Sequence, residues 1–214
     1  DESTESGLIN PKQNEFIDNI FDLYNKEISE IMTPRTDMQC FDLELSYSEN
    51  IDMIKKYKYI IGVSEEVFQT AIYKRLIKEK MIILHNPIDG EKIKKEAMQC
   101  VNEKYDLCYI GRFAKEKNPE EFIYIIDALK NVMPKIKGVM IGTGEMVGEC
   151  KEIIKSRGLS NNIALLGFQE NPYKYLKNSR ILISTSKWEG YGLVVAEAIT
   201  LDKPVIARNS GGVS

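Results

Sequence analysis

Short apolar runs alternate with helical patterns along the second half of this 214-residue chain. The five runs end at glycine or at polar residues, and they cover residues 107–110, 139–141, 163–166, 181–183 and 205–207. Runs of this length are typical of strands that are buried on both faces. Strands that alternate with helices predict an α/β fold, with a Rossmann-like parallel sheet and helices on both of its faces.

Two of the intervening helices carry signals at their ends. Asn118 is a candidate N-cap, Pro119 suits the first helical position, and Glu121 completes an arrangement similar to a capping box. The apolar positions that follow fall on one helix face and are Phe122, Ile125, Ile126 and Leu129. A second helix is predicted over residues 145–157, with Gly158 as its C-terminal stop.

The residues that follow the strands favour a binding site. Ligands of open parallel sheets bind beyond the carboxyl ends of the strands. The chain places cations, glycines, an aromatic residue and a carboxylate at these positions, namely Arg112, Lys117, Gly142, Gly144, Phe168, Glu189, Gly211 and Gly212. Glycine and polar residues also populate loops without a function, but their presence after all five strands favours a site.

The stretch "SKWEGYGLVVAEAI" (residues 186–199) places two glutamates eight positions apart. The chain should become helical from about Tyr191, and Gly190 and Gly192 permit a ligand to approach the first turn closely. Unpaired N–H groups and the helix dipole favour an anion there. Because this helix is apolar on every side, it is predicted to be buried, and Glu197 then needs a hydrogen bond from a hydroxyl or a cation.

Two structural explanations compete with a ligand site in this stretch. Glu189 could close a capping box with Ser186, although the neighbouring glycines make such a box unfavourable, and Glu197 could pair with a lysine. If the glutamates serve a ligand, they lie roughly 10 Å apart, given the rise of a helix. That separation would bracket a diphosphate on the helix N-terminus, with a hydroxylated ring at either end.

Four stretches resemble a known family: "YIGRFAKEKNPEEF", "VMIGTGE", "IALLGF" and "SKWEGYGLVVAEAITLDKPVIARNSGG". They are similar to the C-terminal domain of retaining glycosyltransferases of the GT-B type, in the glycogen-synthase-like and mannosyltransferase-like group. Glu189 and Glu197 satisfy the E-x7-E pattern of that family. The resemblance implies a nucleotide-sugar-binding domain over residues 91–214, truncated at its C-terminus. Residues 59–90 resemble the end of the family's N-terminal domain and the crossover.

The resemblance implies transfer of a hexosyl group from a UDP-type or GDP-type sugar with retention of configuration, without a cofactor or an obligatory metal ion. Arg112 and Lys117 would hold the donor diphosphate, and Glu189 would contact the transferred sugar. Glu197 would accept the ribose hydroxyls, and the backbone at Phe168 would contact the base. The other implied donor contacts are Gly142, Gly190, Tyr191, Gly192 and Leu193.

The front of the chain resembles a different family. "EIMTPRTDMQCFDL" (residues 30–43) is similar to the linker and first CBS segment of hemolysin-C-like magnesium and cobalt efflux proteins. In that family the segment opens a module that binds adenine nucleotides. The resemblance implies a partial CBS-like α+β segment over residues 1–58. The residue pattern itself predicts an amphipathic helix over residues 15–26, and it fits a solvated acidic arm equally well. Two resemblances in one chain predict a chimera or a joined fragment.

Charge and composition narrow the function classes. Residues 1–58 carry 13 acidic and 6 basic side chains, whereas the remainder carries 19 and 23, so its mildly basic balance suits an anionic ligand. The sequence has no basic stripe with interleaved aromatic residues for nucleic acid, and no apolar run long enough for a membrane span. Four cysteines without a C-x-x-C pair make a zinc site unexpected and favour a reduced, cytoplasmic setting.

Three hypotheses therefore follow from the sequence. The chain is the donor-binding part of a glycosyltransferase, an adenine-nucleotide-sensing module, or an inert chimeric fragment. Under the first hypothesis, apolar surface left exposed where an N-terminal domain would dock predicts self-association. The location expected with it is the cytoplasm, with the inner membrane face as a peripheral alternative.

Overall fold

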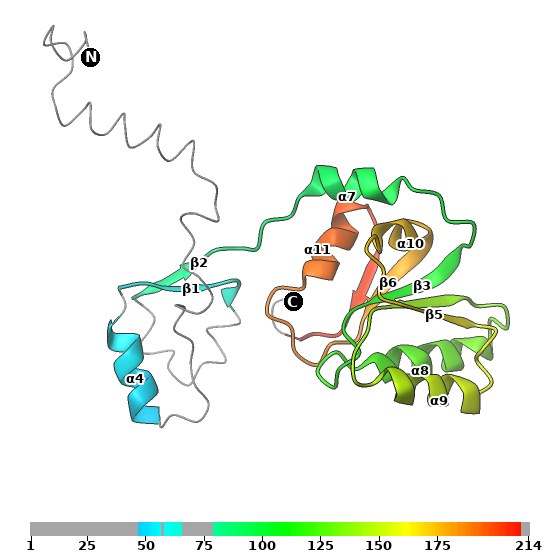
Figure 1. Ribbon diagram of the computed structural model, residues 1–214, viewed down its shortest axis with the longest axis horizontal. Coiled ribbons are helices and arrows are strands. Elements are labelled where there is room, and N and C mark those ends of the chain that lie inside the picture. The colour runs from blue at the N-terminus through cyan, green and yellow to red at the C-terminus, as the bar shows by residue number, and fades with distance from the viewer. Residues whose placement is uncertain (1–46, 57, 66–78, 211–214) are drawn as a thin grey trace, which may run out of the picture. The chain divides into compact units, whose positions relative to one another are not determined.

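A five-stranded parallel sheet forms the centre of the second half of the computed structural model, which describes residues 47–56, 58–65 and 79–210 (Figure 1). Its strands are β3 (Tyr105–Ile110), β4 (Gly138–Ile141), β5 (Ile163–Gly167), β6 (Ser179–Ser184) and β7 (Val205–Ala207). They lie in the order β5-β4-β3-β6-β7, and every neighbouring pair is parallel. The predicted α/β class and all five predicted strands are confirmed.

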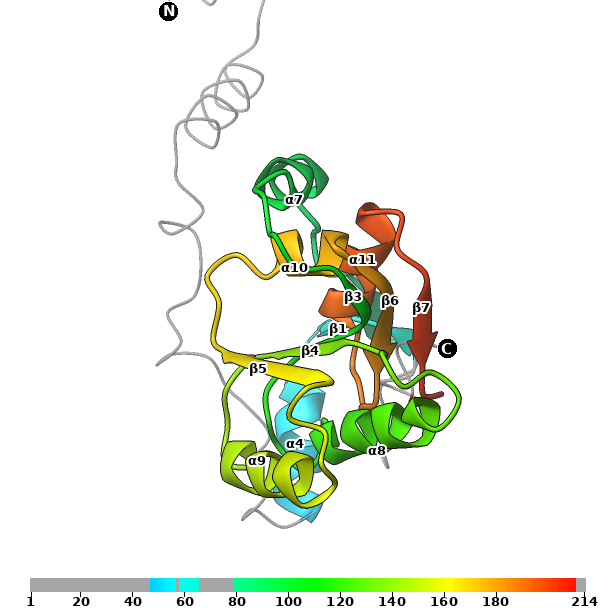
Figure 2. The same cartoon turned by 90° about the vertical axis from the view of Figure 1, so that its right-hand side faces the viewer.

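Helices cover both faces of this sheet (Figure 2). On one face lie α8 (Pro119–Lys130) and α9 (Val147–Ser156), and on the other lie α7 (Gly90–Ala97), α10 (Tyr173–Lys177) and α11 (Leu193–Thr200). Alternate side chains of β3 enter two separate cores. Tyr109 packs with Phe122 of α8, whereas Cys108 packs with Leu176 of α10. This alternation explains why the strands are apolar at successive positions.

The predicted ends of two helices are confirmed only in part. Pro119 is the first residue of α8, but the prediction that the Asn118 side chain caps the helix is wrong. Asn118 has a left-handed backbone with φ of 52°, and its side chain makes no capping hydrogen bond. Its backbone N–H donates to Ala114 instead, so the residue closes the preceding turn. Helix α9 ends at Ser156, and Gly158 follows with φ of 64°, as predicted.

The prediction that the helix after Tyr191 is buried on every side is also wrong. Helix α11 begins at Leu193, and Ala198 is its fully buried residue. The helix contacts α7, β6 and β7, and Val194 and Val195 pack against the core on that side, whereas Leu193 and Ile199 are exposed. Glu197 is half-buried.

The chain forms two compact units, residues 1–53 and 54–214. Helix α4 (Tyr47–Lys56) spans that boundary, and a two-stranded parallel sheet of β1 (Ile60–Gly62) and β2 (Met81–Ile83) belongs to the second unit. The helix expected over residues 15–26 and the CBS-like stretch over residues 30–43 lie outside the described residues. In the part that the structure describes, no helix is long and apolar enough to cross a bilayer.

Candidate donor site at the carboxyl edge of the sheet

The site lies where the order of the strands reverses. From the central strand β3 the chain adds β4 and β5 on one side and then returns to add β6 and β7 on the other. Such a switch point separates the loops at the carboxyl ends of the two central strands and leaves a crevice between them. A cavity of about 390 Å³ occupies this place, between the ends of β3 and β6 and the start of α11.

Two cations and one carboxylate line this cavity, and a second carboxylate pairs with one of the cations. Lys117 forms an ion pair with Glu189 at 2.7 Å between Nζ and Oε2, and the two side chains are only 27% and 17% exposed. Arg112, which is 66% exposed, forms an ion pair with Glu116. Three of these residues were predicted, and the Lys117–Glu189 pair replaces the capping box that Glu189 could have made with Ser186. The sequence analysis missed Glu116.

Hydrogen bonds to backbone carbonyls hold the loop after β3 against the loop after β6. The Thr185 hydroxyl donates to the Lys117 carbonyl at 2.9 Å, and the Lys187 N–H donates to the Glu116 carbonyl at 2.8 Å. The Glu189 N–H donates to the Ser210 carbonyl at 3.1 Å, which ties in the loop after β7. These bonds fix the backbone of the charged residues independently of their side chains.

The N-terminus of α11 opens into the same cavity. Gly192 is its N-cap with φ of 76°, a backbone that costs other residues energy, so the turn itself requires glycine here. The close approach of a ligand at Gly190 and Gly192 stays a prediction. The N–H groups of Leu193 and Val194 precede the first helical carbonyl and lack a partner within the helix. Residues 190–195 all line the cavity, and the field of the helix there favours negative charge.

Two residues before the large sheet also reach this loop. The Ser64 hydroxyl donates to the Gly190 carbonyl at 2.7 Å, and the His85 ring lies 5.6 Å from the Tyr191 ring. Neither residue was predicted as part of the site, because a single serine or histidine has no spacing that marks it.

A second cavity of about 430 Å³ adjoins the first at Arg112. It is lined by the loops after β3, β4 and β5, including Phe168, which the resemblance placed near the donor base, and Gly142, another of the implied donor contacts. Gly142 has φ of 137°, and a Cβ atom there would lie 1.9 Å from the Gly111 carbonyl oxygen. Glycine at this position is therefore required by the packing of two loops as well as suited to a ligand.

Glu197 stands apart from both cavities, and its carboxylate accepts a hydrogen bond of 3.1 Å from the Tyr173 hydroxyl. Burial raises the pKa of Glu197, and the bond from Tyr173 opposes that rise. The expected hydroxyl partner is thus present, whereas pairing with a lysine is not among its interactions in the described region. Tyr173 was missed because nothing in the sequence links it to a residue 24 positions later.

The described residues contain no group of three or more His, Cys, Asp and Glu side chains that could hold a metal ion. Of the residues that the sequence implicated, the first cavity brings together Arg112, Lys117, Glu189, Gly190, Tyr191, Gly192 and Leu193, and the second brings together Arg112, Gly142, Gly144 and Phe168. Gly211 and Gly212 lie outside the described residues.

Comparison with known proteins places the chain among glycosyltransferases. An uncharacterized glycosyltransferase of Methanocaldococcus jannaschii is 28% identical over 183 residues, which cover 77% of this chain and 45% of that protein. The N-acetylgalactosamine-N,N'-diacetylbacillosaminyl-diphospho-undecaprenol 4-alpha-N-acetylgalactosaminyltransferase of Campylobacter jejuni is 32% identical over 133 residues, which cover 61% of this chain and 35% of that protein.

A solved structure shows the same fold. The crystal structure of Anabaena HepE in complex with UDP and glucose superposes with a TM-score of 0.64 at 22% identity, over 78% of this chain and 48% of that chain. The chain thus spans less than half the length of each of these three proteins. The family model described as glycosyl transferases group 1 matches residues 90–214, and the chain therefore belongs to this family.

Proposed function

We propose that residues 59–214 form the donor-binding part of a retaining hexosyltransferase that uses a nucleoside-diphosphate sugar. The diphosphate occupies the first cavity, against the N-terminus of α11, and the transferred sugar lies beside Glu189. The nucleoside extends toward Glu197, and the base lies over the second cavity beside Phe168 and Gly142. In this proposal residues 91–214 supply the donor site, and residues 59–90 are the remnant of the domain that faces it.

The observation that carries the proposal is the convergence of Arg112, Lys117 and the N-terminus of α11 on one cavity at the switch point. Cations and free backbone N–H groups are the donors that recognise a diphosphate. Transfer breaks the bond between the sugar C1 and the diphosphate oxygen, and C1 forms a bond to the acceptor hydroxyl oxygen. The leaving diphosphate gains negative charge and takes up the hydroxyl proton. Donors fixed at that position stabilise the charge as it develops.

The ion pairs of the cavity determine which cation can reach a phosphate at low cost. The Arg112–Glu116 pair is exposed, and an exposed pair contributes only about 0–1 kcal/mol, so Arg112 exchanges its partner readily. The Lys117–Glu189 pair is more enclosed, so we expect it to persist and to place Glu189 at the sugar while Lys117 faces the diphosphate. Anabaena HepE binds UDP, which makes uracil the first base to test.

The experiment is thermal unfolding of the full chain with UDP, UDP-glucose, GDP-mannose, AMP and ATP in parallel. A ligand at a hundred times its dissociation constant stabilises the folded state by about 2.7 kcal/mol. We expect a rise in the unfolding temperature with one sugar nucleotide, which Arg112→Ala reduces strongly. Arg157→Ala is the matched control, because Arg157 also pairs with one carboxylate, Asp127, but follows the end of α9 and lines neither cavity.

The same measurement tests the other two hypotheses. The CBS-like resemblance of residues 1–58 remains a prediction, and it requires stabilisation by AMP or ATP that survives Arg112→Ala. An inert chimeric fragment requires that no nucleotide changes the transition. A response to every nucleotide that Arg112→Ala leaves intact would contradict the donor-site proposal. A GDP-sugar response in place of UDP would keep the site and change the base.

A further inference from the structure

Glu197 is held by a tyrosine from another helix. The Tyr173 hydroxyl of α10 donates to Oε1 of Glu197 on α11 at 3.1 Å. The two helices come from segments on either side of β6, and α7 packs against both of them. The hydroxyl therefore joins two elements that the chain builds separately, and it meets the one carboxylate of α11.

Several features argue that this contact orients the carboxylate. A glutamate side chain has three rotatable bonds, and holding it in one rotamer costs conformational entropy. The tyrosine side chain is more rigid, since only two rotatable bonds place its ring. Only Oε1 of Glu197 is bonded to Tyr173. The second carboxylate oxygen is left to accept other donors.

We propose that Tyr173 is a positioning residue, which holds the Glu197 carboxylate in the orientation that accepts the ribose hydroxyls of the donor nucleotide. The inference rests on the proposed function, because it needs a nucleotide at this site. It assigns a role to a residue outside both cavities. It also makes the ribose contact depend on the packing of α10 against α11.

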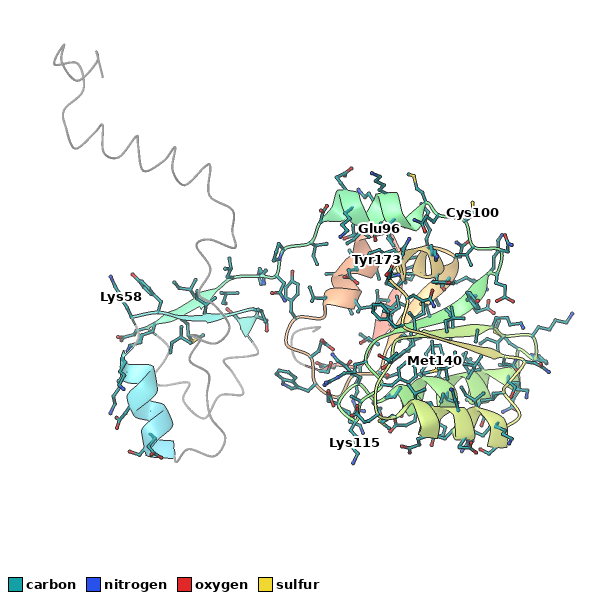
Figure 3. The ribbon with its side chains drawn as sticks, viewed as in Figure 1. Lys58, Glu96, Cys100, Lys115, Met140 and Tyr173 are labelled. Atoms are coloured by element: carbon teal, nitrogen blue, oxygen red, sulfur yellow. The ribbon has the colours of Figure 1, made fainter. Side chains whose placement is uncertain are left out.

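The electrostatic surroundings give this role a pH signature. The Tyr173 hydroxyl from α10 contacts the carboxylate. Glu96 from α7 lies near Tyr173 (Figure 3), and its charge acts on the phenol. Burial raises the pKa of Tyr173 to about 12, with Glu197 and Glu96 adding to the rise, so the phenol keeps its proton and donates at neutral pH. Burial raises the pKa of Glu197, and the hydrogen bond from Tyr173 lowers it. Loss of the hydrogen bond from Tyr173 should therefore raise the pKa of Glu197 further.

The experiment compares Tyr173→Phe with the wild-type full chain by titration calorimetry at pH 8. The probes are UDP and its 2′,3′-dideoxy analogue, which differ only in the ribose hydroxyls. We expect the variant to bind UDP about five-fold more weakly, the size of the effect of one ordinary hydrogen bond, and to bind the dideoxy analogue as the wild type does. In a Glu197→Gln background, Tyr173→Phe should have no further effect.

The matched control is Tyr105→Phe. Tyr105 also donates its hydroxyl to a glutamate, Glu103, at 2.7 Å, but it begins β3 at the opposite edge of the sheet from the candidate site. This variant should leave the affinity for both nucleotides unchanged. The comparison therefore distinguishes the general effect of removing a tyrosine hydroxyl from the effect of removing the hydroxyl that contacts Glu197.

A pH series with UDP-glucose supplies a second readout, since its doubly esterified diphosphate does not titrate near neutrality. Binding through the ribose requires the Glu197 carboxylate, so affinity is lost as the pH falls through its pKa. Because Tyr173→Phe raises that pKa, the variant should lose affinity at a higher pH than the wild type. A purely structural role for Tyr173 would not move this midpoint.

The outcomes separate this inference from the proposed function. Two results would overturn the positioning role and leave the donor site intact. One is that Tyr173→Phe weakens the binding of UDP and of the dideoxy analogue equally. The other is that Tyr173→Phe does not weaken UDP binding, although Glu197→Gln does. If the wild type binds neither a uridine nor a guanosine nucleotide and Arg112→Ala changes nothing, the donor site itself is refuted, and the inference falls with it.

Discussion

At the scale of single residues, both cations of the candidate site already contact a carboxylate, and a diphosphate must compete for the more exposed cation, Arg112. Arg112 donates to Glu116, and this bond helps to lower the pKa of Glu116 below its usual value. Glu116→Gln removes the competing charge while the backbone carbonyl that fixes Lys187 stays in place. We expect UDP to bind about three-fold more tightly, the value of an exposed ion pair, as measured by calorimetry. Glu152→Gln, on the exposed side of α9, is the control, and weaker UDP binding in Glu116→Gln would contradict the competition.

At the scale of elements, the loops after β3 and β4 pack so closely that one position excludes every side chain. A Cβ atom on Gly142 would lie 1.9 Å from the Gly111 carbonyl oxygen, and its φ of 137° is unfavourable for alanine. Gly142→Ala should lower the free energy of unfolding by at least about 2 kcal/mol, measured by denaturant titration. Gly148→Ala is the matched control, because a Cβ atom there meets nothing within 4 Å and alanine favours the helix by about 0.5–1 kcal/mol. Equal stability of the two variants would show that the loops separate without cost.

At the scale of the whole molecule, the two sheets of the second unit differ in how well they are covered. Val139 and Met140 of the five-stranded sheet are buried between two helical layers, whereas Ile61 and Ile82, which are partners in the register of β1 and β2, are 63% and 42% exposed. An uncovered apolar row favours self-association. We expect a dimer that forms with rising concentration in sedimentation velocity and is lost in the Ile61→Lys, Ile82→Lys double variant. Val132→Lys, a change at an exposed side chain outside β1 and β2, should leave the dimer intact, and a wild type that stays monomeric at high concentration would refute the expectation.

The local pattern alone determined the fold class and the positions of the five strands. Buried parallel strands must be continuously apolar, and the glycines and polar residues at their ends mark where the backbone leaves the sheet. The E-x7-E pattern and the stretches around Arg112 and Lys117 indicated the family before any contact was known, because these residues are close together in sequence or follow a strand. The family match over residues 90–214 confirmed that assignment.

Contacts between distant segments could be decided only by the tertiary structure. The Lys117–Glu189 pair joins residues 72 positions apart, and the Tyr173–Glu197 bond joins two helices across a strand. The alternatives of a capping box at Glu189 and a lysine at Glu197 were not found, and the hydroxyl expected for Glu197 could not be assigned to Tyr173, because local spacing says nothing about which segment folds against which. The sequence also predicted that the helix after Tyr191 is buried on every side. This was wrong because composition does not tell how many sides of a helix contact another element. The sequence thus determined the elements and their chemistry, and the packing of loops at the switch point decided which charges meet.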